Sequence, residues 1–246
     1  MNRTSLPSLR LVMRRYGLKP RKSLGQHFLL DLNLATRIAN AAGDLQNYNV
    51  IEIGPGPGGL TRALLESPAK TVFAVEKDDR CIGILEDLKN IYGKRLQVIT
   101  GDALAVDLPA IVPEPRKIVA NLPYNIGTPL LLRWLREVHE YDGLTLTFQS
   151  EVAQRLAAKP NSKAYGRLSV ITQWLCEVRL AFNIANSAFT PQPKVTSTVS
   201  NLTPHPLPLR PVSFETMEKL TAAAFGKRRK MLRTSLKSLN IDFKTH

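Results

Sequence analysis

Short apolar runs alternate along the chain with longer stretches in which apolar residues recur every three or four positions. The runs have the length of buried strands, and they lie at residues 49–53, 71–76, 96–100, 117–120 and 144–149. The stretches between them have the spacing of one face of a helix. Strands that alternate with helices predict an α/β fold, in which helices cover both faces of a mainly parallel sheet.

Helix starts and apolar faces can be predicted along the same stretches. We expect side-chain caps at Asp31, Thr128 and Ser150, with Pro129 in the first turn of the second of these helices. The helix capped by Asp31 is expected to end at Gly43. Further helices are predicted at residues 60–66 and 213–225. The helix after the second strand is expected to bury four apolar residues, which are Ile82, Leu85, Leu88 and Ile91.

Polar and glycine-rich segments follow directly on four of the predicted strands. The loop GPGPGG follows residue 53, Glu76 ends the second strand, GDAL follows Thr100, and NLPY follows residue 120. The carboxyl ends of parallel strands meet at one edge of a sheet, and such folds bind ligands there. We therefore expect these four segments to form one ligand site.

The chain carries a strong positive charge. Its 246 residues include 34 Lys and Arg against 20 Asp and Glu, which gives a formal net charge of +14. This balance suits a polyanionic partner, nucleic acid first and an anionic membrane second, and a merely basic enzyme is the alternative. Because no apolar run approaches the length of a bilayer span, we expect nucleic acid and no membrane.

Cysteine and histidine are too sparse for a disulfide framework or a metal site. Cys81 and Cys176 are the only cysteines, and both lie in apolar stretches. The four histidines are scattered without ligand spacing. We therefore expect a reducing compartment and no bound metal.

The start of the chain is basic and holds no acid before Asp31. Leu9, Val12, Met13 and Tyr16 share one helical face among arginines. Such a start is typical of a transit peptide and equally of a basic arm that touches RNA phosphates. The sequence leaves both open. We expect a cytoplasmic protein, or a mitochondrial one if the start is a transit peptide.

The composition changes after residue 202, where four prolines precede another helical stretch. We predict a large domain at residues 1–206, which includes the basic arm, and a small all-α domain at residues 207–246. A solvated face is the usual meaning of a basic cluster, but on a chain of this charge we expect contacts with RNA phosphates. The cluster consists of Lys227, Arg228, Arg229, Lys230 and Arg233.

The segment EIGPGPGG has two interpretations. Its glycines satisfy the G-x-G-x-x-G pattern of dinucleotide sites, and Glu76 lies where it would hold two ribose hydroxyls. Glu52 favours S-adenosylmethionine (AdoMet) over NAD, because a pyrophosphate has no use for an acid beside the loop. Asp102 is placed to accept a hydrogen bond from an adenine amine, and we therefore expect AdoMet.

The tetrapeptide NLPY favours one reaction. An exocyclic adenine nitrogen is a poor nucleophile because its lone pair is delocalised, and two acceptors on its N–H groups would draw it toward tetrahedral geometry. The Asn121 side-chain oxygen and the Leu122 carbonyl can be those acceptors, with Pro123 holding the carbonyl in place. Tyr124 can stack on a flipped base. An ordinary Asn-Pro turn with a packed tyrosine is the alternative.

The motifs together resemble those of the KsgA family of small-subunit ribosomal RNA adenine dimethyltransferases. The resemblance covers roughly residues 15–236 and is carried by SLGQHFLLD, VIEIGPGPGGLT, VEKDDR, GDAL, NLPYNIGTPLL, NSKAYGRLSV and FTPQPKVTSTV. The erythromycin-resistance methylases, which act on large-subunit rRNA, are similar more distantly. The resemblance implies a Rossmann-like AdoMet-dependent methyltransferase domain followed by the small all-α domain.

The resemblance also implies roles for individual residues. The expected cofactor contacts are Gln26, His27, Leu29, Gly54, Gly56, Glu76, Lys77, Asp102, Ala103 and Asn121. The target adenine would be held by Asn121, Leu122, Pro123 and Tyr124, and Phe189 would form the second wall of its pocket. A core phenylalanine is the alternative for Phe189. The family often has asparagine where His27 stands, and either side chain can donate a hydrogen bond.

The implied reaction is the transfer of two methyl groups to N6 of each of two adjacent adenines near the 3′ end of small-subunit rRNA. We expect a monomer that acts on an immature 30S particle. The alternatives are a large-subunit methylase of the resistance type and a protein that acts mainly as a ribosome-assembly or RNA-binding factor. Family members usually run on past the point where this chain stops, so we expect an incomplete C-terminal domain.

Overall fold

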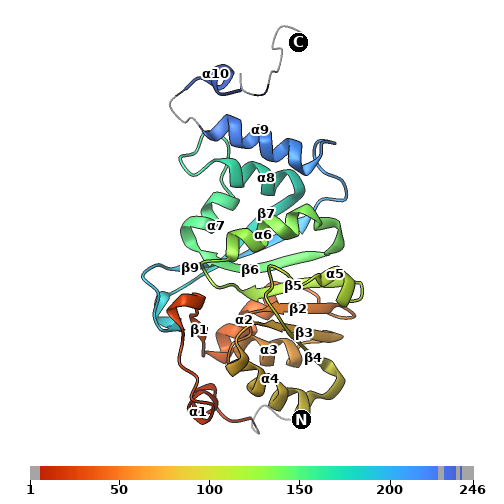
Figure 1. Ribbon diagram of the computed structural model, residues 1–246, viewed down its shortest axis with the longest axis vertical. Helices are drawn as coiled ribbons and strands as arrows, with labels where there is room; N and C mark the ends of the chain where they lie inside the picture. The colour runs from red at the N-terminus through yellow and green to blue at the C-terminus, as the bar shows by residue number, and fades with distance from the viewer. Residues whose placement is uncertain (1–5, 227–229, 237–238, 240–246) are drawn as a thin grey trace.

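A seven-stranded mixed sheet runs through the centre of the protein (Figure 1). The computed structural model describes residues 6–226, 230–236 and 239, and its strand order is β4-β3-β2-β5-β6-β9-β7. The strands of this sheet are β2 Asn49–Ile53, β3 Thr71–Glu76, β4 Leu96–Thr100, β5 Arg116–Asn121, β6 Gly143–Gln149, β7 Cys176–Ile184 and β9 Ser197–Pro204. A two-stranded antiparallel sheet pairs β1 Phe28–Leu29 with β8 Phe189–Thr190.

The strands predicted from the sequence form the parallel part of the sheet, from β4 to β6. The strands β9 and β7 extend the sheet in the antiparallel direction, and neither was predicted. At the edge of the sheet, β7 buries only its end residues, Cys176 and Ile184, so it lacks the apolar run that marks a central strand. The α/β fold is confirmed, with a sheet that is more mixed than expected.

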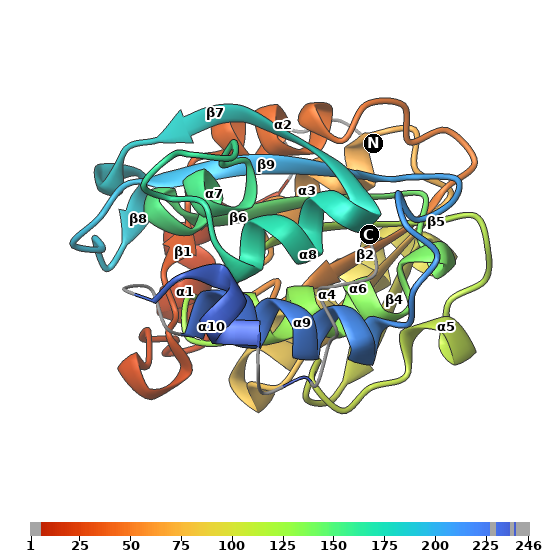
Figure 2. The ribbon, with the colours of Figure 1, turned by 90° about the horizontal axis from the view of Figure 1, so that it is seen from above.

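Helices cover both faces of the sheet, as predicted. They are α1 Leu9–Arg15, α2 Leu32–Ala41, α3 Gly59–Glu66, α4 Asp79–Tyr92, α5 Leu108–Ile111, α6 Gly127–Arg136, α7 Ser150–Leu156, α8 Arg167–Leu175, α9 Phe214–Gly226 and α10 Leu232–Leu236. Short 3-10 turns lie at Lys22–Leu24, Gly93–Arg95, Val138–Glu140 and Asn186–Ala188. Figure 2 shows α2 on one side of the sheet and α6, α8 and α9 on the other.

Alternate side chains of the strands supply the two cores. Val50 of β2 and Val119 of β5 pack with α2, α3 and α4 on one face. Their neighbours Ile51 and Ile118 pack with α6, α7 and α8 on the other. This alternation of side chains across a buried strand explains why the central strands are apolar on both faces.

Two of the three predicted helix caps are wrong. The Asp31 cap is confirmed, because its Oδ1 accepts hydrogen bonds from the backbone N–H groups of Asn33 (2.9 Å) and Leu34 (3.1 Å). Thr128 is no cap, since α6 begins one residue earlier, at Gly127. Ser150 is the first residue of α7, and its hydroxyl bonds to hydroxyls of β9 and the segment before it.

The buried face of α4 differs from the prediction. The buried residues are Cys81, Ile84, Leu85 and Leu88, whereas Ile91 is 42% exposed. Spacing of three residues drifts by about 60° per step around a helix of 3.6 residues per turn. The predicted row from Ile82 to Ile91 therefore turns away from the core.

The N-terminal helix α1 packs against α4. Leu9 and Val12 are buried, and Val12 belongs to a small core with Cys81 and Ile84. The Tyr16 hydroxyl donates a hydrogen bond of 2.5 Å to Oδ2 of Asp87. The predicted amphipathic face is therefore confirmed.

The C-terminal helix α9 packs on α8 (Figure 2). Met217 of α9 is buried in the core on that face of the sheet, and the Phe214 ring lies 6.3 Å from the ring of Trp174 in α8. The indole N–H of Trp174 donates to the Arg210 carbonyl at 2.8 Å. The helical C-terminal region is confirmed, while the division into domains at residue 207 stays a prediction.

Among the described residues, no helix is both long and apolar enough to cross a bilayer.

Candidate active site

A cavity opens at the carboxyl edge of the parallel strands, where the sequence predicted a ligand site. The empty space within its walls, open solvent included, amounts to about 920 Å³. Its walls come from residues 24–29, the glycine loop, residues 75–78, residues 101–103 and the segment that follows β5. The structure thus brings together every residue predicted to contact the cofactor, and Leu122, Pro123 and Tyr124 with them. Their individual roles stay predictions.

The cavity exists because two strands diverge. The pairing of β2 with β5 ends at Ile51 and Ile118, whereas β5 stays paired with β6 as far as Asn121. The glycine loop enters this gap. Gly56 has φ +56°, and a Cβ there would lie 2.9 Å from the ring of Phe28, so both the backbone and the space require glycine.

Three backbone N–H groups hold the carboxylate of Glu76. Its Oε2 accepts a hydrogen bond from the backbone N–H of Gly56 (3.0 Å), and its Oε1 accepts from those of Lys77 and Asp78 (2.8 Å each). Burial raises the pKa of Glu76, and these hydrogen bonds oppose that shift. Glu76 therefore joins the glycine loop to the end of β3.

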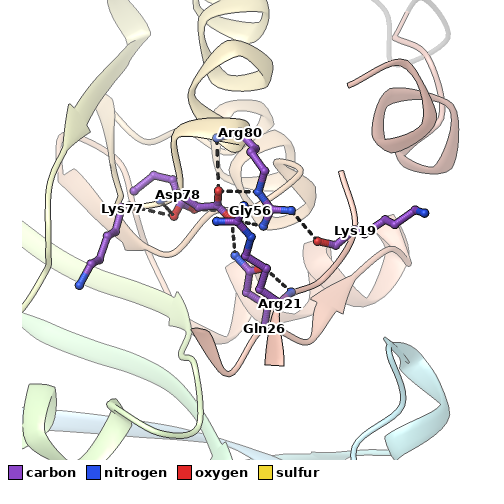
Figure 3. Close-up of polar contacts among 8 residues, drawn as sticks. Lys19, Arg21, Gln26, Gly56, Lys77, Asp78 and Arg80 are labelled. Carbon is purple, nitrogen blue, oxygen red and sulfur yellow. Dashed lines mark hydrogen bonds and ion pairs between the residues drawn. The ribbon is translucent and has the colours of Figure 1, made fainter. Parts of the chain in front are cut away.

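Asp78 ties the loop before β1 to the site (Figure 3). Its carboxylate accepts from Arg80 Nε (2.8 Å) and from Gln26 Nε2 (2.8 Å), and Arg80 donates in turn to the Lys19 carbonyl (2.8 Å). The Arg80 guanidinium lowers the pKa of Asp78 to about 2. The side-chain oxygen of Gln26 also accepts from the backbone N–H of Arg21 (2.9 Å). The oxygen and the nitrogen of this side-chain amide therefore both fix the loop before β1.

The sequence prediction missed Asp78 and Arg80 as supports of the site. Both belong to VEKDDR, so the segment was noticed while its internal ion pair was not. An ion pair between two residues that lie two positions apart at a helix start has no distinctive sequence pattern. Gln26, which donates to Asp78, lies 52 residues away from it in the chain.

Asp102 stands at the mouth of the cavity. Its Oδ2 lies 2.6 Å from Lys77 Nζ, and its Oδ1 accepts from the backbone N–H of Leu104 (2.9 Å). The hydrogen bond from Lys77 is the main cause that lowers the pKa of Asp102. The carboxylate is therefore ionised and oriented, as an acceptor for an amine must be.

Glu52 lines the cavity from β2 and is 2% exposed. Burial, with a smaller contribution from Glu76, raises the pKa of its carboxyl to about 8. Its Oε2 has no hydrogen-bond partner among the described residues. This acid is available to a ligand.

Asn121 ends β5 and presents a free oxygen. Its Nδ2 donates to the His27 carbonyl at 3.3 Å, which sets the orientation of the amide. Its Oδ1 is buried and has no hydrogen-bond partner within the described part of the chain. An unpaired buried acceptor is costly, so it marks a position where a donor binds.

Tyr124 and Phe189 lie in different surroundings. The Tyr124 ring borders the cavity, and its hydroxyl bonds to the Ser197 hydroxyl at 2.5 Å. Phe189 in β8 pairs with Leu29, is 3% exposed, and packs in the core beneath α2 and α3. The structure does not place Phe189 in the cavity wall, and its role as the second wall stays a prediction.

The predicted RNA-binding cluster is described only in part. Lys227, Arg228 and Arg229 lie outside the described residues, whereas Lys230 and Arg233 are exposed. No group of three or more His, Cys, Asp or Glu in the described ranges could hold a metal ion.

Comparison with known proteins agrees with this geometry. The chain is 61% identical to the ribosomal RNA small subunit methyltransferase A of Paramagnetospirillum magneticum, over 95% of this chain and 83% of the relative. It superposes on a dimethyladenosine transferase from Plasmodium falciparum with a TM-score of 0.73 at 29% identity, over 86% of this chain and 75% of that one. It superposes on the 23S rRNA methyltransferase ErmE with a TM-score of 0.68 at 28% identity, over 86% of this chain and 84% of that one.

The family profile described as ribosomal RNA adenine dimethylase matches residues 17–244, which is nearly the whole chain. The order of the parallel strands and the cavity at the switch point of the sheet agree with a methyltransferase fold. The chain belongs to the ribosomal RNA adenine dimethylase family.

Proposed function

We propose that the protein transfers methyl groups from AdoMet to N6 of two adjacent adenines near the 3′ end of small-subunit rRNA, giving N6,N6-dimethyladenines. The name of its 61% identical relative supports the small subunit over the large one, because the large-subunit enzyme that the chain resembles is only 28% identical.

The oriented amide of Asn121 carries the proposal. The hydrogen bond from its Nδ2 to the His27 carbonyl leaves Oδ1 as a buried acceptor at the cavity wall. An adenine amine supplies the N–H that this oxygen lacks. The Leu122 carbonyl, in the next residue along the same wall, accepts the second N–H. With both N–H groups held, the nitrogen lone pair is freed from the ring and directed at the methyl donor.

The residues of the cavity fit AdoMet. Glu76 would accept the ribose hydroxyls, Asp102 would accept the adenine amine, and the buried Glu52 would face the positive charge of the methionine end. The glycine loop lets the backbone approach the ligand closely. When bound, the cofactor supplies a methyl group on a positively charged sulfur, which is a strong electrophile.

The residues of the protein orient the reaction. Tyr124 stacks on the flipped base and keeps its amine in line with the donor. No strong base is required before transfer, since methylation itself makes the amine N–H acidic. The monomethylated amine then rotates or rebinds for the second transfer.

The basic C-terminal cluster and the net charge of +14 suit a particle rich in rRNA. Phosphate contacts would set affinity and position, while the pocket would select the base. We propose an immature small subunit as the substrate, a monomer as the active form and the cytoplasm as the place of action.

The test is incubation with labelled AdoMet and undermethylated small subunits, followed by mapping of the modified adenines. Label on two adjacent adenines near the 3′ end of the small-subunit rRNA is the expected result. Label in large-subunit rRNA would instead support the resistance-type activity, and tight binding without label would support a pure assembly factor.

A further inference from the structure

The aromatic ring of Tyr124 is linked at two points to one distant segment, residues 191–197, directly through Ser197 and indirectly through His27. At one end of this segment the Pro191 carbonyl lies 2.7 Å from Nδ1 of His27, whose ring lies 5.0 Å from that of Tyr124 and is tilted by 30°. At the other end the Ser197 hydroxyl lies 2.5 Å from the Tyr124 hydroxyl. In this part of the chain, the sequence pointed to only one functional residue, Phe189, which lies just before the segment.

We propose that residues 191–197 brace Tyr124 in the orientation that methyl transfer needs, with Ser197 as a positioning residue for the reaction. This inference rests on the proposed function, in which Tyr124 stacks on the target adenine. Ser197 itself touches neither base nor cofactor; it acts through the tyrosine hydroxyl.

Ser197 is a rigid anchor. It is the first residue of β9, a strand that lies between β6 and β7, and it pairs with Gln149 on one side and Ile184 on the other. Its side chain is completely buried. A hydroxyl fixed in the interior of a sheet moves far less than one on a loop.

Tyr124 needs such an anchor because it has none of its own. It lies in the turn between β5 and α6, outside any helix or strand. Burial raises the pKa of its phenol, so the group is neutral and can donate to or accept from Ser197. Without this bond the ring can tilt about its side-chain torsions and carry a stacked base with it.

His27 supports the same ring from the other end of the segment. A carbonyl oxygen only accepts, so the contact with Pro191 means that Nδ1 of His27 carries the proton and donates. His27 also presents its backbone carbonyl to Asn121. The brace therefore connects the stacking ring to the residue that orients the amine.

A small tilt of the ring has a large kinetic effect. The target amine has to meet Asn121 Oδ1, the Leu122 carbonyl and the methyl donor at once, and misplacement of about 1 Å can cost up to 100-fold in rate. Stacking itself tolerates a tilt. Loss of the brace should therefore lower kcat and change KM little.

The test compares Ser197→Ala with Ser200→Ala in methylation of undermethylated small subunits. Ser200 lies on the same strand, is also completely buried, and has no hydrogen-bond partner among the described residues. We expect kcat to fall about 10-fold for S197A, with KM unchanged within about twofold. S200A should match the unaltered protein. Equal kcat values for S197A and S200A would overturn the inference.

A second variant removes the same hydrogen bond without a change in β9. Tyr124→Phe should reproduce the loss of kcat, and the double variant should show no further loss, because the two changes delete one interaction. The same cycle is measured in thermal unfolding. Coupling in unfolding without coupling in kcat would show a merely structural bond and would also overturn the inference.

These outcomes are separate from a failure of the proposed function. If the unaltered protein leaves small-subunit adenines unlabelled, the proposed function fails. If it labels them and the brace variants label them equally fast, only the inference fails.

Discussion

The two halves of the sheet carry different functional groups. On the side of β2, β3 and β4 the site presents three acids, Glu52, Glu76 and Asp102, of which Glu52 is neutral at pH 7 because burial raises its pKa to about 8. On the side of β6 and β9, outside the cavity wall, hydroxyl groups bond to one another: the Ser150 hydroxyl bonds to those of Thr196 (3.0 Å) and Thr198 (2.9 Å). A positively charged methyl donor is favoured by carboxylates, whereas a neutral adenine is placed by shape and hydrogen bonds.

The halves also differ in what supports their functional groups. The Glu76 carboxylate is held by the backbone N–H groups of Gly56, Lys77 and Asp78. On the other side the support comes from a neighbouring strand: the Thr198 hydroxyl of β9 donates a hydrogen bond to the side-chain oxygen of Asn183 in β7 (2.8 Å). From this comparison we predict that cofactor binding depends on charge and that placement of the target adenine depends on rigidity.

The largest effect is expected where the halves meet, at Asn121. Asn121→Ala removes the free Oδ1 and should lower methylation by at least about 100-fold, as loss of an oriented transition-state contact does. Small-subunit binding should be retained. The measurement is incorporation of labelled methyl groups, with Asn125→Ala, an exposed amide of the same turn, as the control. Methylation at the full rate would show that the amide has no part in the reaction.

The next largest effect concerns the charged half. In Glu76→Gln one carboxylate oxygen becomes an amide N–H₂, which would face backbone N–H donors where an acceptor is needed. We expect AdoMet affinity, measured by calorimetry, to fall by about 10-fold or more. Glu86→Gln on α4, outside the cavity wall, is the control. If both variants bind AdoMet alike, Glu76 is not a cofactor ligand.

The third prediction concerns the pH dependence of stability, which Glu52 of the charged half should cause. The raised pKa of Glu52, about 8 against an ordinary 4.5, means that the folded protein keeps a proton that the unfolded chain releases. Its contribution to stability is therefore complete below pH 4.5 and is lost as the pH rises toward 8. Glu52→Gln cannot ionise.

Between pH 6 and 8 the cofactor-free protein should lose more than about 1 kcal/mol of unfolding free energy relative to this variant. Denaturant unfolding at several pH values measures the difference. Parallel pH profiles for the two proteins would contradict the assignment of a neutral Glu52.

The smallest effect uses one buried thiol from each half. Cys81 lies in α4 beside the charged half, Cys176 begins β7, and both are buried with a raised pKa. Both thiols should react slowly with a thiol reagent. AdoMet should slow the labelling of Cys81 several-fold more than that of Cys176, because it holds the elements around its own cavity. NAD is the control ligand, and equal protection of both thiols would argue against independent halves.

The parts of the site that follow strands could be predicted because their signals are local. Central strands are buried on both faces, so their apolar runs are visible in the sequence; Glu76 and Asn121 end two such strands, and the glycine loop and Asp102 follow two others. The caps at Thr128 and Ser150 failed for the opposite reason. A serine or threonine before a helix is a common signal, but α6 begins one residue before Thr128, and the Ser150 hydroxyl bonds instead to hydroxyls that only the fold brings near it.

By itself, then, the sequence determined the alternation of strands and helices, the edge at which the ligand site lies and the residues that come first after each strand. The tertiary structure alone decided that β9 enters the sheet, that Phe189 packs in a core and that Ser197 meets Tyr124 across 73 residues of chain. The physical reason is the range of the interactions. Periodicity and turn chemistry act between near neighbours, whereas a hydrogen bond between distant hydroxyls exists only after the sheet has brought them together.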